Sequence, residues 1–339
     1  MKKPIFLFSN GELKRKDNTI YFELEGEQSL KKFIPVENTA ELHIFGEVGL
    51  NKRILEFLSQ EGILIHFYNY YGYYTGSFYP REHYNSGMII LKQVEHYIDN
   101  SKRLFLAKKF VQGALENIKR NLEYYNNRSS ELGEELDKIE TFINKIMDIG
   151  NEGNDKAIEE LMALEGNARE IYYQCFDKIL KDENFSFESR SKRPPQNKLN
   201  ALISFGNSLV YTYTLSEIYK THLDPRIGYL HTTNFRRFSL NLDIAEIFKP
   251  ILTDRSIFKL INKGMLSEKH FMKHLEGIYL SEEGKKLFVQ EMEERMQTTI
   301  QHRKLGRKVS YRSLIRLELY KLEKHLLGDE IYEPFVIWW

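Results

Sequence analysis

The chain has 339 residues, enough for about two domains, and 42% of them are hydrophobic, which is sufficient for a sizeable core. The 49 lysines and arginines nearly balance the 48 aspartates and glutamates, so the net charge of +1 excludes an overall polybasic protein. The single cysteine, Cys175, excludes an internal disulfide framework, and no apolar run has the length of a signal peptide or a membrane span. We therefore expect a soluble, cytoplasmic protein without a membrane partner.

The N-terminal part of the chain has the pattern of short strands separated by turn residues. Apolar or alternating runs predict strands at residues 5–8, 12–24, 40–45 and 63–68. Asp17 and Asn18 lie in the middle of the second run, as they would at the turn of a hairpin. Apolar residues at helical spacing predict one helix over residues 51–60.

Aromatic residues surround Gly72 and Gly76 in the segment NYYGYYTGSFYPRE, residues 69–82. This pattern predicts a second hairpin. Its aromatic side chains either pack within a sheet or form a surface for a dimer or another partner, because exposed tyrosines favour interfaces.

The pattern changes to helical spacing after residue 87. Apolar residues predict one helix over 91–125 and another, acidic on its solvent face, over 131–147. The predicted fold class is α+β, with a small N-terminal β-domain over residues 1–86 and a larger all-α C-terminal domain over residues 87–339.

An acidic residue interrupts the apolar face of the next predicted helix. Glu165 lies on the stripe that should be buried, which is formed by Ile158, Leu161, Ala168 and Tyr172. A buried carboxylate is usually paired, protonated or bound to a metal ion. Two interpretations are open: an ion pair with Arg169 one turn further on, or a metal ligand.

A pair of acids follows the segment GYLH. His231 precedes a mostly apolar helix whose only acids are Asp243 and Glu246, three residues apart and therefore on one side. The apolar stripe of that helix is formed by Leu240, Ile244, Ile247 and Ile251. An imidazole and converging carboxylates are ligands of a hard or borderline divalent cation.

Two segments are strongly basic. The loop over residues 185–198 contains Arg190, Lys192, Arg193 and Lys198, and is either a solvated linker or a phosphate clamp. Residues 302–316 hold six arginines or lysines and no acid, so they either complement acidic neighbours or contact a nucleic-acid backbone. Between these segments we predict a central, nearly apolar helix over 200–219 and a polar insertion over 263–284. The apolar ending YEPFVIWW is expected to pack back on the helices or on a partner.

The sequence resembles the near-universal CRISPR-associated integrase family, the metal-dependent DNases that insert new spacers into CRISPR arrays. Blocks in family order carry the resemblance over essentially the whole chain: IFGEVGLNKRILEFLSQEGILIHFYNYYGYYTGSFYPRE, ALEGNARE, RPPQNKLNALISFGNSL, LDPRIGYLH and SLNLDIAEIFKPILTDRSIFKLI. The aromatic N-terminal block looks most like that of type I-B members.

The resemblance implies a site and a reaction. The metal ligands of the family fall on Glu165, His231 and Glu246, with Asp243 as a supporting acid. The implied cofactor is Mn²⁺ or Mg²⁺, and the implied reaction joins prespacer 3'-hydroxyl ends to the CRISPR repeat by transesterification. The resemblance also implies a homodimer formed through the N-terminal domain, a small ferredoxin-like CRISPR-associated partner and, as an optional partner, a third adaptation nuclease.

DNA contacts are expected from the basic segments, namely from Arg190, Arg193, Lys198, Arg312 and Arg316. The chain departs from the family between His231 and the acidic helix, where residues 235–238 read FRRF in place of a more uniformly small segment. Two other functions remain open at this point. One is a DNA-binding scaffold without chemistry, and the other is a structure-selective DNase in repair.

Overall fold

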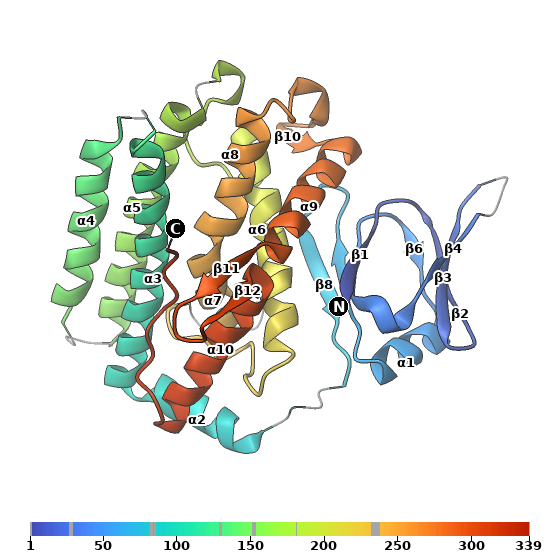
Figure 1. Ribbon diagram of the computed structural model, residues 1–339, viewed down its shortest axis with the longest axis horizontal. Helices are drawn as coiled ribbons and strands as arrows, with labels where there is room; N and C mark the ends of the chain where they lie inside the picture. Colours follow the sequence, from blue (N-terminus) through green and yellow to red (C-terminus); the bar gives the residue numbers. More distant parts are fainter. Residues whose placement is uncertain are drawn as a thin grey trace. The chain divides into compact units, whose positions relative to one another are not determined.

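The computed structural model describes residues 2–26, 30–81, 84, 86–128, 131–150, 154–180, 182–231 and 238–338. The chain divides into two compact units, Met1–His83 and Tyr84–Trp339. The first is a small β-unit and the second is mainly helical, which confirms the predicted fold class (Figure 1). None of the described helices is both long enough and apolar enough to cross a bilayer.

The described residues of the N-terminal unit form two four-stranded sheets, with strand orders β1-β5-β7-β8 and β4-β3-β2-β6. Its elements are β1 (Lys3–Leu7), β2 (Gly11–Lys16), β3 (Thr19–Leu24), β4 (Lys31–Ile34), β5 (Thr39–Ile44), β6 (Val48–Gly49), α1 (Lys52–Gln60), β7 (Leu64–Tyr68) and β8 (Tyr74–Phe78). Apolar side chains of both sheets and of α1 form one buried cluster, which includes Leu13, Phe22, Leu42, Ile65 and Leu58.

Turn chemistry in this unit follows the sequence. Asp17 has a φ of 53° at the turn between β2 and β3, which confirms the predicted hairpin. Gly72 has a φ of 87° between β7 and β8, where the Asn69 side chain accepts hydrogen bonds from the Tyr71 and Tyr73 backbone N–H groups. Asn51 caps α1 by accepting the Ile54 N–H, so the predicted helix begins where its capping residue stands.

The C-terminal unit is a bundle of long helices with two added hairpins. Its helices are α2 (Gly87–Ile98), α3 (Asn100–Asn126), α4 (Gly133–Asp148), α5 (Asn154–Leu180), α6 (Lys198–Ile218), α7 (Ser239–Lys249), α8 (Arg255–Asn262), α9 (Glu282–Gln297) and α10 (Tyr311–Leu327). A π-helical turn over Pro250–Asp254 joins α7 to α8. The hairpins are β9 (Phe271–His274) with β10 (Gly277–Leu280), and β11 (Thr299–His302) with β12 (Arg307–Ser310).

Helix α6 is buried on almost every side, as its nearly apolar sequence predicts, and it packs against α7 and α10. Helix α7 also packs against α3. The apolar stripe predicted for α7 is confirmed, since Leu240, Ile244 and Ile247 are fully buried. This burial fixes the rotation of α7 about its axis, and with it the directions of its acids.

The predicted helix over residues 91–125 is wrong in one respect, because the structure has two helices that meet at Asp99. The Asp99 side chain accepts the N–H groups of Ser101 and Lys102, both at 3.0 Å, and so starts α3 as its N-cap. The predicted polar insertion over 263–284 contains the hairpin β9–β10 and the start of α9.

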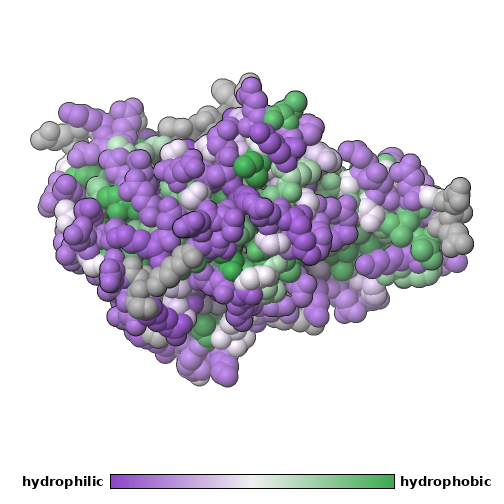
Figure 2. Space-filling view, turned by 90° about the horizontal axis from the view of Figure 1, so that it is seen from above, coloured by the Kyte–Doolittle hydropathy of each residue, from purple (hydrophilic) through white to green (hydrophobic). Residues whose placement is uncertain are grey.

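The C-terminal tail packs back on the bundle, as expected from its apolar residues. The Phe335 N–H donates to Glu318 of α10 at 2.9 Å, and the Ile337 N–H donates to Asn117 of α3 at 2.8 Å. On the face of the molecule shown in Figure 2, hydrophilic residues predominate and apolar residues form small separate patches. That face therefore has the composition of an ordinary solvated surface.

Candidate metal centre

Glu165 lies on the buried side of α5, as the sequence predicts. Glu165 is 7% exposed, and the apolar residues of the stripe around it are all buried: Ile158, Leu161, Ala168 and Tyr172. The Arg169 guanidinium donates from Nε to Glu165 Oε1 at 3.0 Å. The ion pair proposed as one of two interpretations is therefore present.

Asp243 holds the turn that carries His231. Its Oδ2 accepts the Tyr229 N–H at 2.6 Å and the Leu230 N–H at 3.2 Å, while Oδ1 accepts the His231 N–H at 3.0 Å. The turn approaches α7 closely at Gly228, where an added Cβ would lie 2.5 Å from the Ser239 carbonyl carbon. Glycine is therefore required at this position for packing.

The same carboxylate orients the His231 ring. Nδ1 of His231 lies 2.8 Å from Asp243 Oδ1, and since an ionised carboxylate can only accept, Nδ1 carries the hydrogen. In the neutral ring the lone pair is then on Nε2, as in metal-ligating histidines that are held by a carboxylate. Burial alone would lower the pKa of His231, but its hydrogen bond with Asp243 and the charges of Asp243, Glu246 and Glu165 raise it.

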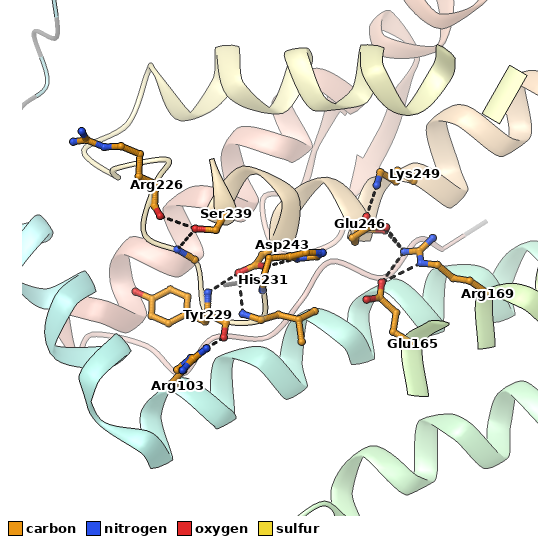
Figure 3. A network of polar contacts seen from close by, with 12 residues as sticks. Arg103, Glu165, Arg169, Arg226, Tyr229, His231, Ser239, Asp243, Glu246 and Lys249 are labelled. Carbon is orange, nitrogen blue, oxygen red and sulfur yellow. Dashed lines mark hydrogen bonds and ion pairs between the residues drawn. The ribbon is translucent and has the colours of Figure 1, made fainter. Parts of the chain in front are cut away.

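Glu246 faces α5, away from the contacts of Asp243. The Arg169 Nη2 lies 2.5 Å from Glu246 Oε2 and 3.0 Å from Glu165 Oε1, so one guanidinium bridges both carboxylates (Figure 3). Lys249 pairs with the other oxygen of Glu246. Burial would raise the pKa of Glu246, but the charges of Arg169, Lys249 and His231 outweigh it and lower the pKa to about 2.

The two acids of α7 therefore have different partners, although the sequence places them on one side of the helix. Three residues correspond to about 300° of rotation, which leaves the side chains about 60° apart. That difference directs Asp243 to the turn at Tyr229 and Glu246 to Arg169 (Figure 3).

The donor set fits a divalent cation in its chemistry. Glu165 and Glu246 supply two carboxylates, and His231 supplies an imidazole within electrostatic range of both. Arg169 places a positive charge between the carboxylates, where a bound cation would neutralise them. The ligand atoms of Glu165, His231 and Glu246 do not all lie within 4.8 Å of one another.

The amino-acid sequence matches the family described as CRISPR associated protein Cas1 over residues 5–294. The chain belongs to the Cas1 family. It is 62% identical over 339 residues to "CRISPR-associated endonuclease Cas1 2" of Thermodesulfovibrio yellowstonii, with both chains covered completely. It is 52% identical over 330 residues to "CRISPR-associated endonuclease Cas1" of Thermotoga maritima, covering 97% of this chain and 98% of the relative.

Solved structures agree with this assignment to the Cas1 family. The structure of a Cas1 protein from Thermotoga maritima matches with a TM-score of 0.87 and 50% identity, over 98% of this chain and 99% of the other. A casposase bound to integration product has the same TM-score of 0.87 at 20% identity, over 99% of this chain and 93% of the other. At that identity the casposase shows a common fold only.

The basic loop of this Cas1-family chain contains both paired and exposed cations. Arg190 donates to Asn200 Oδ1 at 2.8 Å and to Ser204 Oγ at 3.0 Å, so it fastens the loop to α6. Lys198 pairs with Glu268. Arg193 is exposed to solvent.

The second basic segment forms the hairpin β11–β12 and the start of α10. Arg316 Nε donates to the buried Glu217 at 2.7 Å, and Arg312 lies 3.7 Å from the same carboxylate. Arg312 and Arg316 therefore have acidic neighbours, which is the first of the two interpretations of this basic segment. The cations exposed on the hairpin were not singled out from the sequence: Arg303, Lys304, Arg307 and Lys308. The departure at residues 235–238 falls, up to residue 237, outside the described residues.

The amino-acid sequence alone also did not reveal a group of potential metal ligands in the N-terminal unit. Among the described residues, Glu41, His43 and His66 are the set of His, Cys and acidic residues that offer ligand atoms all within 4.8 Å of one another. All three are buried. The spacing of Glu41 and His43 places both on one face of a strand and could have indicated a pair, but His66 is far away in sequence.

Proposed function

We propose that this Cas1-family chain is a metal-dependent DNA endonuclease and integrase of CRISPR adaptation, which joins prespacer 3'-hydroxyl ends to the CRISPR repeat by transesterification. One observation carries the proposal: Glu165 and Glu246 are held on the two sides of Arg169, and His231 is oriented nearby by Asp243. The names of the relatives as endonucleases support it.

Mn²⁺ or Mg²⁺ is the proposed cofactor, with Glu165, His231 and Glu246 as its ligands. When bound, such a cation polarises a phosphoryl oxygen and lowers the pKa of the hydroxyl group that attacks. No further side chain is then needed as a general base.

The protein's own groups prepare the ligands for this role. Asp243 fixes the His231 ring and its Nδ1 hydrogen, which leaves Nε2 as the ligand atom. Without a bound cation, Arg169 and Lys249 keep the Glu246 carboxyl ionised near neutral pH despite its burial, and a bound cation would take over this role from Arg169. Asp243 thus acts as a positioning residue and not as a ligand.

DNA is the proposed substrate, and the basic segments are its proposed contact surface. Exposure favours Arg193 among the residues predicted from the sequence. Lys198 lies at the edge of the same loop and pairs with Glu268. Arg190, Arg312 and Arg316 already have partners within the protein, so each would contact DNA while it keeps those partners. A phosphodiester backbone favours such clustered cations without regard to sequence.

The proposed assembly is a homodimer, formed through the N-terminal unit, that acts in the cytoplasm with the small ferredoxin-like CRISPR-associated protein and, as an optional partner, a third adaptation nuclease. The proposed membership in type I-B rests on the aromatic-rich N-terminal block at residues 44–82. These statements follow from the family resemblance.

An integration assay tests the proposed function. The chain and its small partner are incubated with a prespacer that has 3'-hydroxyl ends and a supercoiled repeat plasmid, with Mn²⁺, Mg²⁺ or EDTA. We expect joined products with either metal and none with EDTA. Glu165→Gln should lower joining at least about 100-fold, because it removes a charged ligand. Glu170→Gln, a change of an exposed acid on the same helix, should not.

The other outcomes separate the alternatives. Unchanged joining by Glu165→Gln would refute the metal assignment. Degradation of the prespacer without joining would indicate a structure-selective DNase. Binding of DNA with neither product would indicate a scaffold without chemistry.

A further inference from the structure

The strand register in the N-terminal unit brings three metal-ligand side chains together. Strands β5 and β7 run parallel, with His43 opposite His66, and Glu41 lies two residues before His43 on the same face of β5. One ligand atom from each of the three lies within 4.8 Å of the others. The His43 Nε2 is 3.3 Å from Glu41 Oε1, a spacing suited to two ligands of one ion.

Hydroxyl groups contact both imidazoles at Nδ1. The Tyr68 hydroxyl lies 2.8 Å from His43 Nδ1, and the Ser77 hydroxyl lies 2.7 Å from His66 Nδ1. Ser77 is in turn 2.9 Å from the Tyr74 hydroxyl. Histidines that bind metals commonly donate their second N–H in this way, which fixes the ring and assigns the ligand role to Nε2.

The surroundings of the group exclude water. Glu41, His43 and His66 are each 0% exposed, and the Phe6 ring stacks on His43 with centroids 4.5 Å apart. We propose that Glu41, His43 and His66 form a binding site for a divalent cation in the N-terminal unit, in addition to the site proposed for catalysis.

The donor atoms indicate the class of cation. Two imidazoles and one carboxylate suit a borderline ion such as Zn²⁺, whereas a set dominated by carboxylates suits Mg²⁺ or Mn²⁺. The site is buried on one face of the paired strands β5 and β7, which suits a structural ion that joins the two strands.

Zinc stoichiometry of the full-length chain tests this site. The double variant Glu165→Gln/Glu246→Gln is loaded with Zn²⁺, dialysed and analysed for bound zinc, so that the proposed catalytic site does not contribute. We expect one zinc per chain. The further change His66→Gln should remove it, whereas His222→Gln, which alters a more exposed histidine of the other unit, should not. If the double variant, with His66 intact, bound no zinc, the proposal would be overturned.

A milder variant covers the case in which His66→Gln does not fold. Tyr68→Phe keeps the ring but removes the hydroxyl at His43 Nδ1. It should weaken Zn²⁺ binding by about 10- to 100-fold, as losses of such supporting contacts do. Tyr70→Phe, at an exposed tyrosine, should leave the dissociation constant unchanged. Equal zinc affinity of Tyr68→Phe and the parent would also overturn the proposal. Because catalysis is not measured, this outcome is independent of the proposed function.

Discussion

Two acids on α7 show two ways in which a protein can stabilise a buried carboxylate. Asp243 accepts hydrogen bonds from three backbone N–H groups and one imidazole, all within the short turn at residues 229–231. Glu246 is instead paired with Arg169 and Lys249, the cationic ends of long side chains. Backbone donors cannot leave without unfolding the turn, whereas a long side chain can move. The first arrangement therefore suits positioning, and the second suits a group that must exchange partners.

The largest expected effect comes from removing the fixed arrangement. Asp243→Ala leaves the N–H groups of Tyr229, Leu230 and His231 without their acceptor, at about 1–3 kcal/mol each when buried. We expect the free energy of unfolding, measured by urea titration, to fall by about 3 kcal/mol or more. Asp177→Ala, which removes an acceptor of a single backbone N–H, should cost less. An equal loss from both variants would contradict this account.

A third buried acid, Asp254, extends the comparison, because it has neither arrangement. It ends the π-helical turn after α7, and burial raises its pKa to about 7 against the opposing charge of Arg169. The folded-state pKa lies above the ordinary value of 3.8, so the contribution of protonated Asp254 to stability is complete below pH 3.8 and is lost as the pH rises from there through about 7.

Asp254→Asn, which stays neutral at every pH, should therefore raise stability relative to the parent at pH 8.5 by about 1–3 kcal/mol. At pH 5.5 the gain should be roughly half as large, because unfolded Asp254 is then already ionised while folded Asp254 is still largely protonated. Thermal unfolding at the two pH values measures the difference. A stability difference that is the same at both would show that Asp254 does not titrate in this range.

The smallest effect is expected at the exchangeable arrangement. Arg169→Met removes the cation that the two carboxylates share, so it should lower stability in EDTA and strengthen Mn²⁺ binding at Glu165 and Glu246. We expect about tenfold tighter binding by calorimetry, equivalent to ~1.4 kcal/mol. Arg120→Met, at an exposed arginine of α3, serves as the control. Weaker Mn²⁺ binding by Arg169→Met would indicate that Arg169 supports the site and does not compete for it.

Much of the fold could be predicted from periodicity and capping residues. Strands β1, β2, β3, β5, β7 and β8, helix α1 and the buried helix α6 follow directly from their patterns, whereas the short strands β4 and β6 were not predicted. The break at Asp99 was missed because apolar residues continue at helical spacing on both sides, and only the side-chain cap ends the pattern. The short hairpins β9–β10 and β11–β12 were missed because four-residue strands rich in polar residues have weak signals.

The candidate site was predictable where a residue contradicts its surroundings. Glu165 stands out because an acid interrupts an apolar stripe. The separate roles of Asp243 and Glu246 could not be predicted, because they depend on the backbone of a turn 12–14 residues earlier and on a helix 77 residues away. The pairing of His43 with His66 depends on strand register, which local sequence does not determine.

The burial of α6 has a consequence for how the C-terminal unit unfolds. A helix that is apolar on almost every side has no face that tolerates water, so no subset of its neighbours can leave without exposing it. We expect cooperative unfolding of the helices around it, and amide hydrogens in α6 that exchange with solvent only through that global event. The slowest exchange in this unit would then report the stability of the whole bundle that carries Glu165, His231 and Glu246.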